Sequence, residues 1–241
     1  MAELPPVRLG VHILAAYGAV LILRRPLETR WVTSAEDVSQ PVRQFCFDLT
    51  AGLSAGLLAA MLNRIFFEFP AGSMISLIAG AFIYGFFIAL DMSLSRERSV
   101  IQKTLSRDSF RAPPKRLYSM TRRFTWVAVA TALCVTVVNL MVLARDMSWL
   151  TTVGTDPGAI QMAVLSIAYE VLFIMVVLLG LAINLIISYS RNLKLLFENE
   201  TRVLERVTNG DLSRMVPVAT RDEFGLIAGH TNTMIEGLRH R

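Results

Sequence analysis

The chain has 241 residues, 54% of them hydrophobic, and a mean hydropathy of +0.50, which is more apolar than an ordinary soluble domain. The two cysteines and three histidines are too few and too scattered to favour a disulfide framework or a metal site, so we expect neither a metal nor a cofactor. The net charge is +5, but nine basic residues gather between residues 96 and 123, between apolar segments. That pattern is typical of a cytoplasmic loop of a membrane protein, and we expect no nucleic-acid partner.

Five apolar segments are long enough, or nearly so, to cross a bilayer as helices. They cover residues 9–24, 45–67, 71–94, 124–144 and 160–190. The first is short, but Arg24 and Arg25 follow it directly without a small-residue cleavage site, so we predict a retained anchor and not a signal peptide. The transmembrane domain is thus expected to occupy residues 1–190.

Loop charges predict how these spans are oriented. The basic stretches 25–44 and 95–123 are expected in the cytoplasm, and a tight turn at 68–70 and the loop 145–158 outside, with the N-terminus also outside. The fifth segment then returns the chain to the cytoplasm. Its 31 residues would form a helix of about 46 Å, longer than the apolar core of a bilayer, so we expect it to project into the cytoplasm.

Residues 191–241 are charged and carry two short heptad patterns. The first consists of Leu193, Phe197, Leu204 and Val207, with Glu200 at the missing position, and the second of Phe224, Ile227, Thr231, Met234 and Leu238. A 3.5-residue repeat is the pattern of helices that pack in coiled coils. Two heptads are too short for a lone coiled coil, so we predict a four-helix bundle formed by two copies of the chain.

The connector 209–222 separates the two patterns. Gly210 is suited to end the first helix in the left-handed conformation, and Asp222 and Glu223 place negative charge at the start of the second. Leu212, Val216 and Val218 are expected to fold back onto the helices while Pro217 keeps the connector extended. Its length allows the two helices to run parallel.

These residues resemble a HAMP domain, the signal-relay linker of bacterial receptors, histidine kinases and class III nucleotide cyclases. The resemblance covers residues 191–241 and rests on Gly210-Asp211-Leu212, Val216-Pro217-Val218, Asp222-Glu223-Phe224-Gly225 and Asn232-Thr233-Met234. It implies a core of Leu193, Phe197, Leu204, Val207, Ile227, Thr231 and Leu238. Thr231 and Glu200 depart from the bulky apolar residues usual in the family.

A wider resemblance joins the last spans and the HAMP-like segment to bacterial class III adenylate/guanylate cyclases. It implies a multi-pass protein of the bacterial inner membrane, with the HAMP domain in the cytoplasm and a cyclase domain after it. Members of that group usually have six spans, against the five counted here. None of the 241 residues is expected to be catalytic, and whether the parent protein is an enzyme stays open.

Three carboxylates fall within apolar spans. Glu170 lies about ten residues into the fifth span and is either a ligand- or proton-responsive group or a residue that orders helix packing. Asp48 and Asp91 are expected near cytoplasmic ends, paired with loop arginines. Gly52 and Gly56 have the GxxxG spacing that permits close helix approach, within one bundle or between two copies.

The sequence thus predicts an all-α fold: a polytopic helical bundle followed by a HAMP-type helix–connector–helix. The expected function is to relay a membrane-sensed state to an output domain, by resemblance a cyclase. A histidine kinase or chemoreceptor output is the alternative, and a transporter or channel with a cytoplasmic oligomerisation domain is less favoured because no internal repeat is seen. Expected partners are membrane lipids, a second copy of the chain, and an unidentified membrane ligand or protein.

Overall fold

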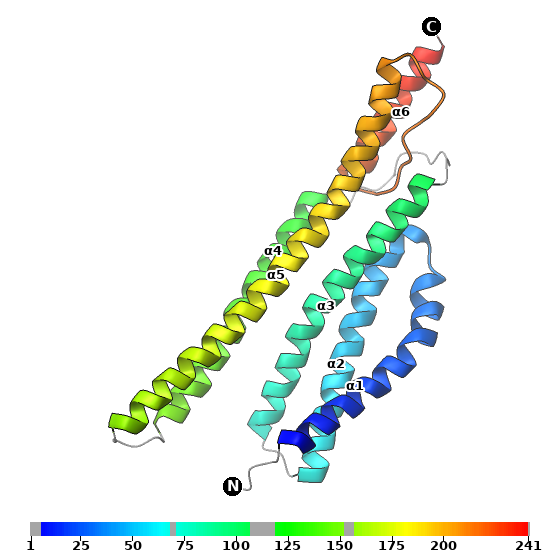
Figure 1. Ribbon diagram of the computed structural model, residues 1–241. Coiled ribbons are helices and arrows are strands. Elements are labelled where there is room, and N and C mark those ends of the chain that lie inside the picture. Colours follow the sequence, from blue (N-terminus) through cyan, green and yellow to red (C-terminus); the bar gives the residue numbers. More distant parts are fainter. Residues whose placement is uncertain (1–5, 68–70, 107–118, 152–156, 241) are drawn as a thin grey trace. The chain divides into compact units, whose positions relative to one another are not determined.

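The computed structural model describes residues 6–67, 71–106, 119–151 and 157–240, and no strand occurs in these ranges. The expectation of an all-helical chain is confirmed. The helices are α1 (Pro6–Glu28), α2 (Gln40–Phe67), α3 (Ala71–Ser106), α4 (Met120–Leu150), α5 (Pro157–Thr208) and α6 (Glu223–Arg239). A π-helix, Thr29–Thr33, and a short 3-10 helix, Asp37–Ser39, lie between α1 and α2 (Figure 1).

Five of the described helices, α1 to α5, are long and apolar enough to cross a membrane. Several extend past the apolar segments, because regular backbone hydrogen bonding continues where the sequence turns polar. Thus α3 runs on to Ser106, through the first part of the stretch expected to be a basic loop, and α4 ends at Leu150. The tight turn expected at 68–70, and parts of the two longer loops, lie outside the described residues.

The chain forms two compact units, and α5 contributes to both. One unit comprises residues 1–117 and 188–241, and the other comprises residues 118–187. The domain division expected near residue 190 follows polarity along the sequence, whereas these units follow contacts, so that division stays a prediction.

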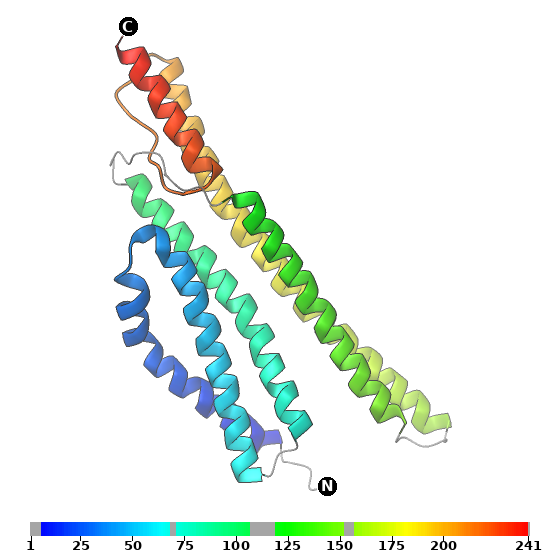
Figure 2. The same cartoon turned by 180° about the vertical axis from the view of Figure 1, so that it is seen from behind.

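In the first unit α2 packs between α1 and α3 (Figures 1 and 2). Its contact with α3 is made of small residues, including the buried Ala55 and Ala59. A Cβ atom added to Gly56 would lie 2.2 Å from the Cβ of Ala81, and one added to Gly52 would lie 3.2 Å from the Cα of Gly85. The GxxxG pair therefore serves packing within one chain, because only glycine lets these two backbones approach so closely.

The same unit contains the end of α5, the connector and α6. Val203 of α5, Val216 and Val218 of the connector, and Ala228 and Ile235 of α6 form one buried apolar cluster. Figure 2 shows the connector running beside α6 before that helix begins. The connector thus fills its share of the core with alternate apolar residues, which fixes α6 next to α5.

The second unit consists of α4 and the first part of α5. Most of its large apolar side chains are exposed, as expected for helices that face lipid. Asp146 is the buried charged residue described in α4, and it lies one turn before the helix ends.

Candidate functional site

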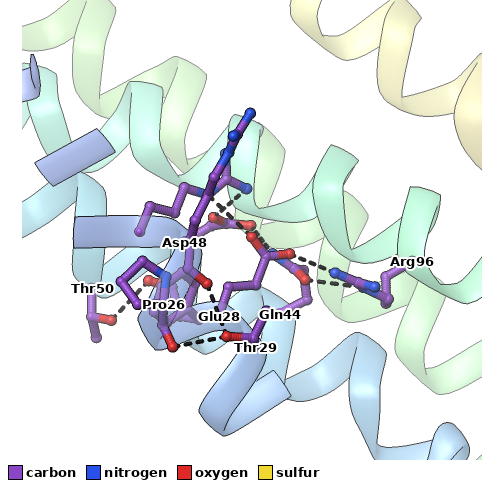
Figure 3. A network of polar contacts seen from close by, with 10 residues as sticks. Pro26, Glu28, Thr29, Gln44, Asp48, Thr50 and Arg96 are labelled. Carbon is purple, nitrogen blue, oxygen red and sulfur yellow. Dashed lines mark hydrogen bonds and ion pairs between the residues drawn. The ribbon is translucent and has the colours of Figure 1, made fainter. Parts of the chain in front are cut away.

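A closed polar network joins the ends of α1, α2 and α3. Arg24 of α1 contacts Asp48 of α2 at 2.9 Å, and Gln44 donates to the other oxygen of Asp48 at 2.7 Å. Arg96 of α3 donates to Gln44 at 3.1 Å and pairs with Glu28 of α1. Figure 3 shows the Arg96 guanidinium facing both Glu28 and Gln44. Two positive and two negative groups thus hold one another where three helices meet.

Burial makes this network sensitive to the loss of any member. Asp48 and Gln44 are buried, and the two arginines and Glu28 are half-buried. Removing one partner of a buried ion pair leaves an uncompensated charge and costs more than the pair contributes. The network therefore ties the three helix ends into a unit that moves together. Asp48 is placed next to an arginine, as the sequence suggested, and that arginine belongs to the end of α1.

A second set of hydrogen bonds joins α3 to α5. Arg98 donates through Nε to Asn192 Oδ1 at 3.0 Å and through one terminal nitrogen to the backbone oxygen of Ser188 at 3.1 Å. Ser188 donates to Asp91 at 2.8 Å, and Asn192 donates to the backbone oxygen of Leu94 at 3.0 Å. Asp91 therefore meets a serine of α5 in this junction, in addition to any contact with a loop.

The spacing of these residues explains why they meet. Asp91, Leu94 and Arg98 recur at three and four positions on α3, and Ser188 and Asn192 are four apart on α5, so each set shares one helix face. Asn192 and Ser188 are buried. The contact is therefore a hydrogen-bonded seam along one turn of each helix.

Arg96 and Arg98 are two residues apart on α3, so their side chains leave the helix on nearly opposite faces. One reaches α1 and α2, and the other reaches α5. This turn of α3 connects the three-helix network to the helix that continues to Thr208. Sequence reasoning counted both arginines only as loop charge; their two-residue spacing was the available signal, but it needed α3 to extend past residue 94.

Local rules fix the connector and the start of α6. Gly210 has φ of 82°, the left-handed conformation that ends a helix. Asp222 accepts a hydrogen bond from the Phe224 backbone at 3.1 Å and caps α6, while Thr220 donates to the same carboxylate at 2.6 Å. A Cβ on Gly225 would lie 2.1 Å from the backbone oxygen of Thr220, so the first turn of α6 requires glycine there.

Two other side chains of the sequence motif bond the connector. Asn232 accepts from the Val216 backbone N–H at 2.7 Å and donates to the Val216 carbonyl at 2.9 Å, which satisfies both polar groups of a buried backbone unit. Ser213 donates to Asp211 through its side chain and backbone, and these bonds lower the pKa of the Asp211 carboxyl. The resulting stabilisation is present above the ordinary carboxyl pKa and is lost as the pH falls through the lowered value.

The predicted heptad core is only partly buried within one chain. Thr231 is buried and Val207 packs against the apolar cluster, and Leu193 and Phe224 are half-buried. Phe197, Leu204, Ile227, Met234 and Leu238 are all exposed, between 38% and 57%. The single chain builds its core from other positions, since Val203 and Ile235 point toward the connector. The exposed heptad residues remain predicted contacts with a second copy.

Glu170 of α5 pairs with Arg145 of α4 in the second unit. Arg145 also contacts Asp146 at 3.0 Å, so one guanidinium serves two carboxylates. The sequence named Arg64 as a conceivable partner of Glu170, but Arg145 fills that position. Its location near the end of α4 gave no sign of this, because the loop was expected to begin at residue 145.

Comparison with known protein families matches residues 1–173 to MASE10. The chain belongs to the MASE10 family. MASE10 is a membrane-associated sensory domain, and this assignment together with the five long apolar helices makes the chain a multi-pass membrane sensory module. The matched region holds the α1–α3 network, Arg98 and the Arg145–Glu170 pair, and it ends within α5.

One curated relative is a "Cyclic di-GMP phosphodiesterase" from Vibrio cholerae serotype O1, 25% identical over 181 residues. The alignment covers 74% of this chain and 36% of the relative, so the MASE10 chain spans about a third of that protein. No solved structure matches. The expected signalling input module is confirmed at this level, and the more specific HAMP and cyclase assignments belong to the proposal below.

Proposed function

We propose that this MASE10 chain is the input and relay of a transmembrane signalling protein. The observation that carries the proposal is the Arg98 seam, which connects the α1–α3 bundle to α5 at Ser188 and Asn192. Because α5 is one continuous helix to Thr208, a shift of α3 at this seam changes the position or rotation of the helix that enters the cluster of Val203 and the connector. The three-helix network is the input that the seam reads.

We infer that residues 191–241 act as a HAMP-type relay. Support comes from the left-handed Gly210, the capping Asp222, the obligatory glycine at 225 and the Asn232 clamp on Val216, which give each motif residue a structural task. A relay of this kind needs two packings that differ by only a few kcal/mol. The polar pair of Glu200 and Thr231, joined by a 2.7 Å hydrogen bond, is suited to a small gap.

The relay is proposed to work as a homodimer. Five large apolar side chains at heptad positions are exposed on the two helices of one chain: Phe197, Leu204, Ile227, Met234 and Leu238. A parallel second copy would bury this stripe as a four-helix bundle. We place this bundle in the cytoplasm of a bacterium, with the chain in the inner membrane, because basic residues gather at the same ends of the spans.

The output proposed for the parent protein is turnover of a cyclic nucleotide. The name of the Vibrio cholerae relative favours cyclic di-GMP, and the relative's greater length leaves room for a catalytic domain. The resemblance of the last spans and HAMP-like segment to class III adenylate/guanylate cyclases favours the second candidate. Assays of the full-length parent for cyclic di-GMP hydrolysis and for cyclase activity separate the two.

Disulfide cross-linking of the whole chain in membranes tests the relay. In a Cys46→Ser, Cys134→Ser background, Leu204→Cys should cross-link two copies, whereas Arg202→Cys, which is exposed but off the stripe, should not. Replacing Arg98 by Ala should then change the extent of the Leu204→Cys cross-link, because it releases α5 from α3. Equal cross-linking at both positions, or no effect of the Arg98 replacement, would count against the proposal.

A further inference from the structure

The corner between α1 and α2 sorts its charges unequally. Its four acidic residues all contact a cation. Asp48 and Glu28 bind Arg24, and Glu28 also binds Arg96. Asp37 contacts Lys103 at 2.9 Å, and Glu36 contacts Arg221 of the connector at 2.8 Å. No carboxylate of this corner is therefore left to neutralise further positive charge.

Three arginines of the same corner have no acidic partner among the residues that the structure describes. Arg25 and Arg30 are exposed, and Arg43 is half-buried and donates to the backbone oxygen of Trp31 at 3.0 Å. Arg24 and Arg25 are neighbours in sequence, yet the first lies inside the three-helix network and the second faces away from it. This separation leaves a localised positive surface.

Trp31 lies within this positive surface. Its side chain is 45% exposed, and its ring lies 6.3 Å from that of Phe47 on α2. The exposed apolar residues Leu27 and Val42 flank it. Tryptophan is enriched where apolar membrane meets headgroups, since its ring is apolar and its N–H is polar. Apolar side chains beside unpaired arginines fit an amphipathic surface better than a nucleic acid.

We propose that Arg25, Arg30, Trp31 and Arg43, here named the arginine corner, bind the phosphate headgroups of anionic phospholipids. The apolar part of α1 ends at Arg24, so the arginine corner falls at headgroup depth when α1 spans the bilayer. Guanidinium groups suit phosphate because they present several donors in one plane. The π-helix Thr29–Thr33 holds Arg30 and Trp31, and such turns are frequent at functional sites.

The arginine corner gives the input network a ligand. Arg25 directly follows Arg24, and Glu28 lies between Arg25 and Arg30, so headgroup binding acts on the same turns that hold Asp48 and Arg96. The lipid composition of the inner leaflet would then bias the position of α3. This role as stimulus rests on the proposed function, whereas lipid binding itself does not.

Native mass spectrometry of the whole chain, released from micelles doped with phosphatidylglycerol or phosphatidylcholine, tests the lipid site. Arg25→Gln/Arg30→Gln is compared with Arg202→Gln/Arg206→Gln, which removes the same charge from the cytoplasmic part of α5. A basic residue near an anionic surface changes affinity roughly fivefold, so the first pair should weaken phosphatidylglycerol retention by about 30-fold at low salt. The control pair and phosphatidylcholine retention should not change.

Unchanged phosphatidylglycerol retention in Arg25→Gln/Arg30→Gln would overturn the proposal, as would an equal loss in the control pair. Displacement of the lipid by low millimolar inorganic phosphate would also overturn it, since the site would then belong to a free anion. An unchanged thermal unfolding profile confirms that the variant is folded. If retention falls but the Leu204→Cys cross-link does not depend on phosphatidylglycerol, the lipid site stands and its role as stimulus fails.

Discussion

Thr231 of α6 donates a hydrogen bond to Glu200 of α5 at 2.7 Å, and these are the two residues that interrupt the heptad patterns of their helices. In sequence they are two separate departures from an apolar core. In the structure they form one polar layer in which each residue satisfies the other. A buried hydroxyl without a partner costs about 1–3 kcal/mol, so the pair is far less costly than two isolated defects. The layer is a place where packing can change at little cost.

Replacing both residues should reveal this coupling. We expect Thr231→Leu or Glu200→Leu alone to destabilise the segment, since each leaves the other polar group unsatisfied. The double variant should recover the loss, with a coupling energy of about 1 kcal/mol. The rate of limited proteolysis at the connector of the whole chain measures this. The double variant should also hold the parent's output in one state, and additive losses with unchanged signalling would contradict the interpretation.

Arg96 and Arg98 should have separable effects although they are two residues apart. Arg98→Lys removes the planar fork that reaches Ser188 and Asn192, so the Leu204→Cys cross-link should lose its dependence on the membrane bundle while thermal unfolding changes little. Arg96→Lys instead weakens the pairing with Glu28 and should lower the unfolding temperature of the whole chain. The same phenotype from both variants would show that α3 does not divide these tasks.

Gly225 should tolerate no side chain. An added Cβ would lie 2.1 Å from a backbone oxygen, and backbone cannot move aside as a flexible side chain can. We expect Gly225→Ala to destabilise the α6 segment by about 1–3 kcal/mol. Gly237→Ala is the matched control in the same helix, because nothing lies within 4 Å of its added Cβ. Proteolysis at the connector should accelerate in the first variant only.

The α2–α3 contact allows the same comparison within the spans. Gly56→Ala places a Cβ 2.2 Å from that of Ala81, whereas Gly80→Ala meets nothing within 4 Å. The first should lower the thermal unfolding temperature in detergent, and the second should leave it unchanged or raise it slightly, since alanine favours helix. Equal behaviour of the two variants would mean that α2 and α3 do not pack through these glycines.

Much of the connector could be predicted from the sequence because its residues act locally. A glycine after a heptad helix is suited to positive φ, as Gly210 shows, and an aspartate before an apolar repeat is suited to cap it, as Asp222 shows. The apolar alternation of Val216 and Val218 indicated which side chains turn inward. The all-helical fold followed in the same way from long apolar runs.

The polar junctions could not be predicted, because they depend on which helices are neighbours. Arg98 meets Asn192 from 94 positions away, and only the packing of α3 against α5 brings them together. The exposed heptad stripe has the opposite origin. Periodicity shows that Leu204 and Ile227 share a seam, but it does not distinguish a core within one chain from a contact between two.

The pairing of Arg145 with two carboxylates predicts an order of effects in the second unit. Formally the cluster carries one positive and two negative charges, so Glu170→Gln brings it to neutrality, whereas Arg145→Gln leaves two negative groups together. Asp146 is almost fully buried and loses its contact with the guanidinium in the second variant. We therefore expect Arg145→Gln to lower the unfolding temperature in nanodiscs more than Glu170→Gln, with a difference of about 1–3 kcal/mol. Arg145→Gln/Glu170→Gln should recover part of the loss, and a double variant worse than both singles would show that the three groups do not act as one cluster.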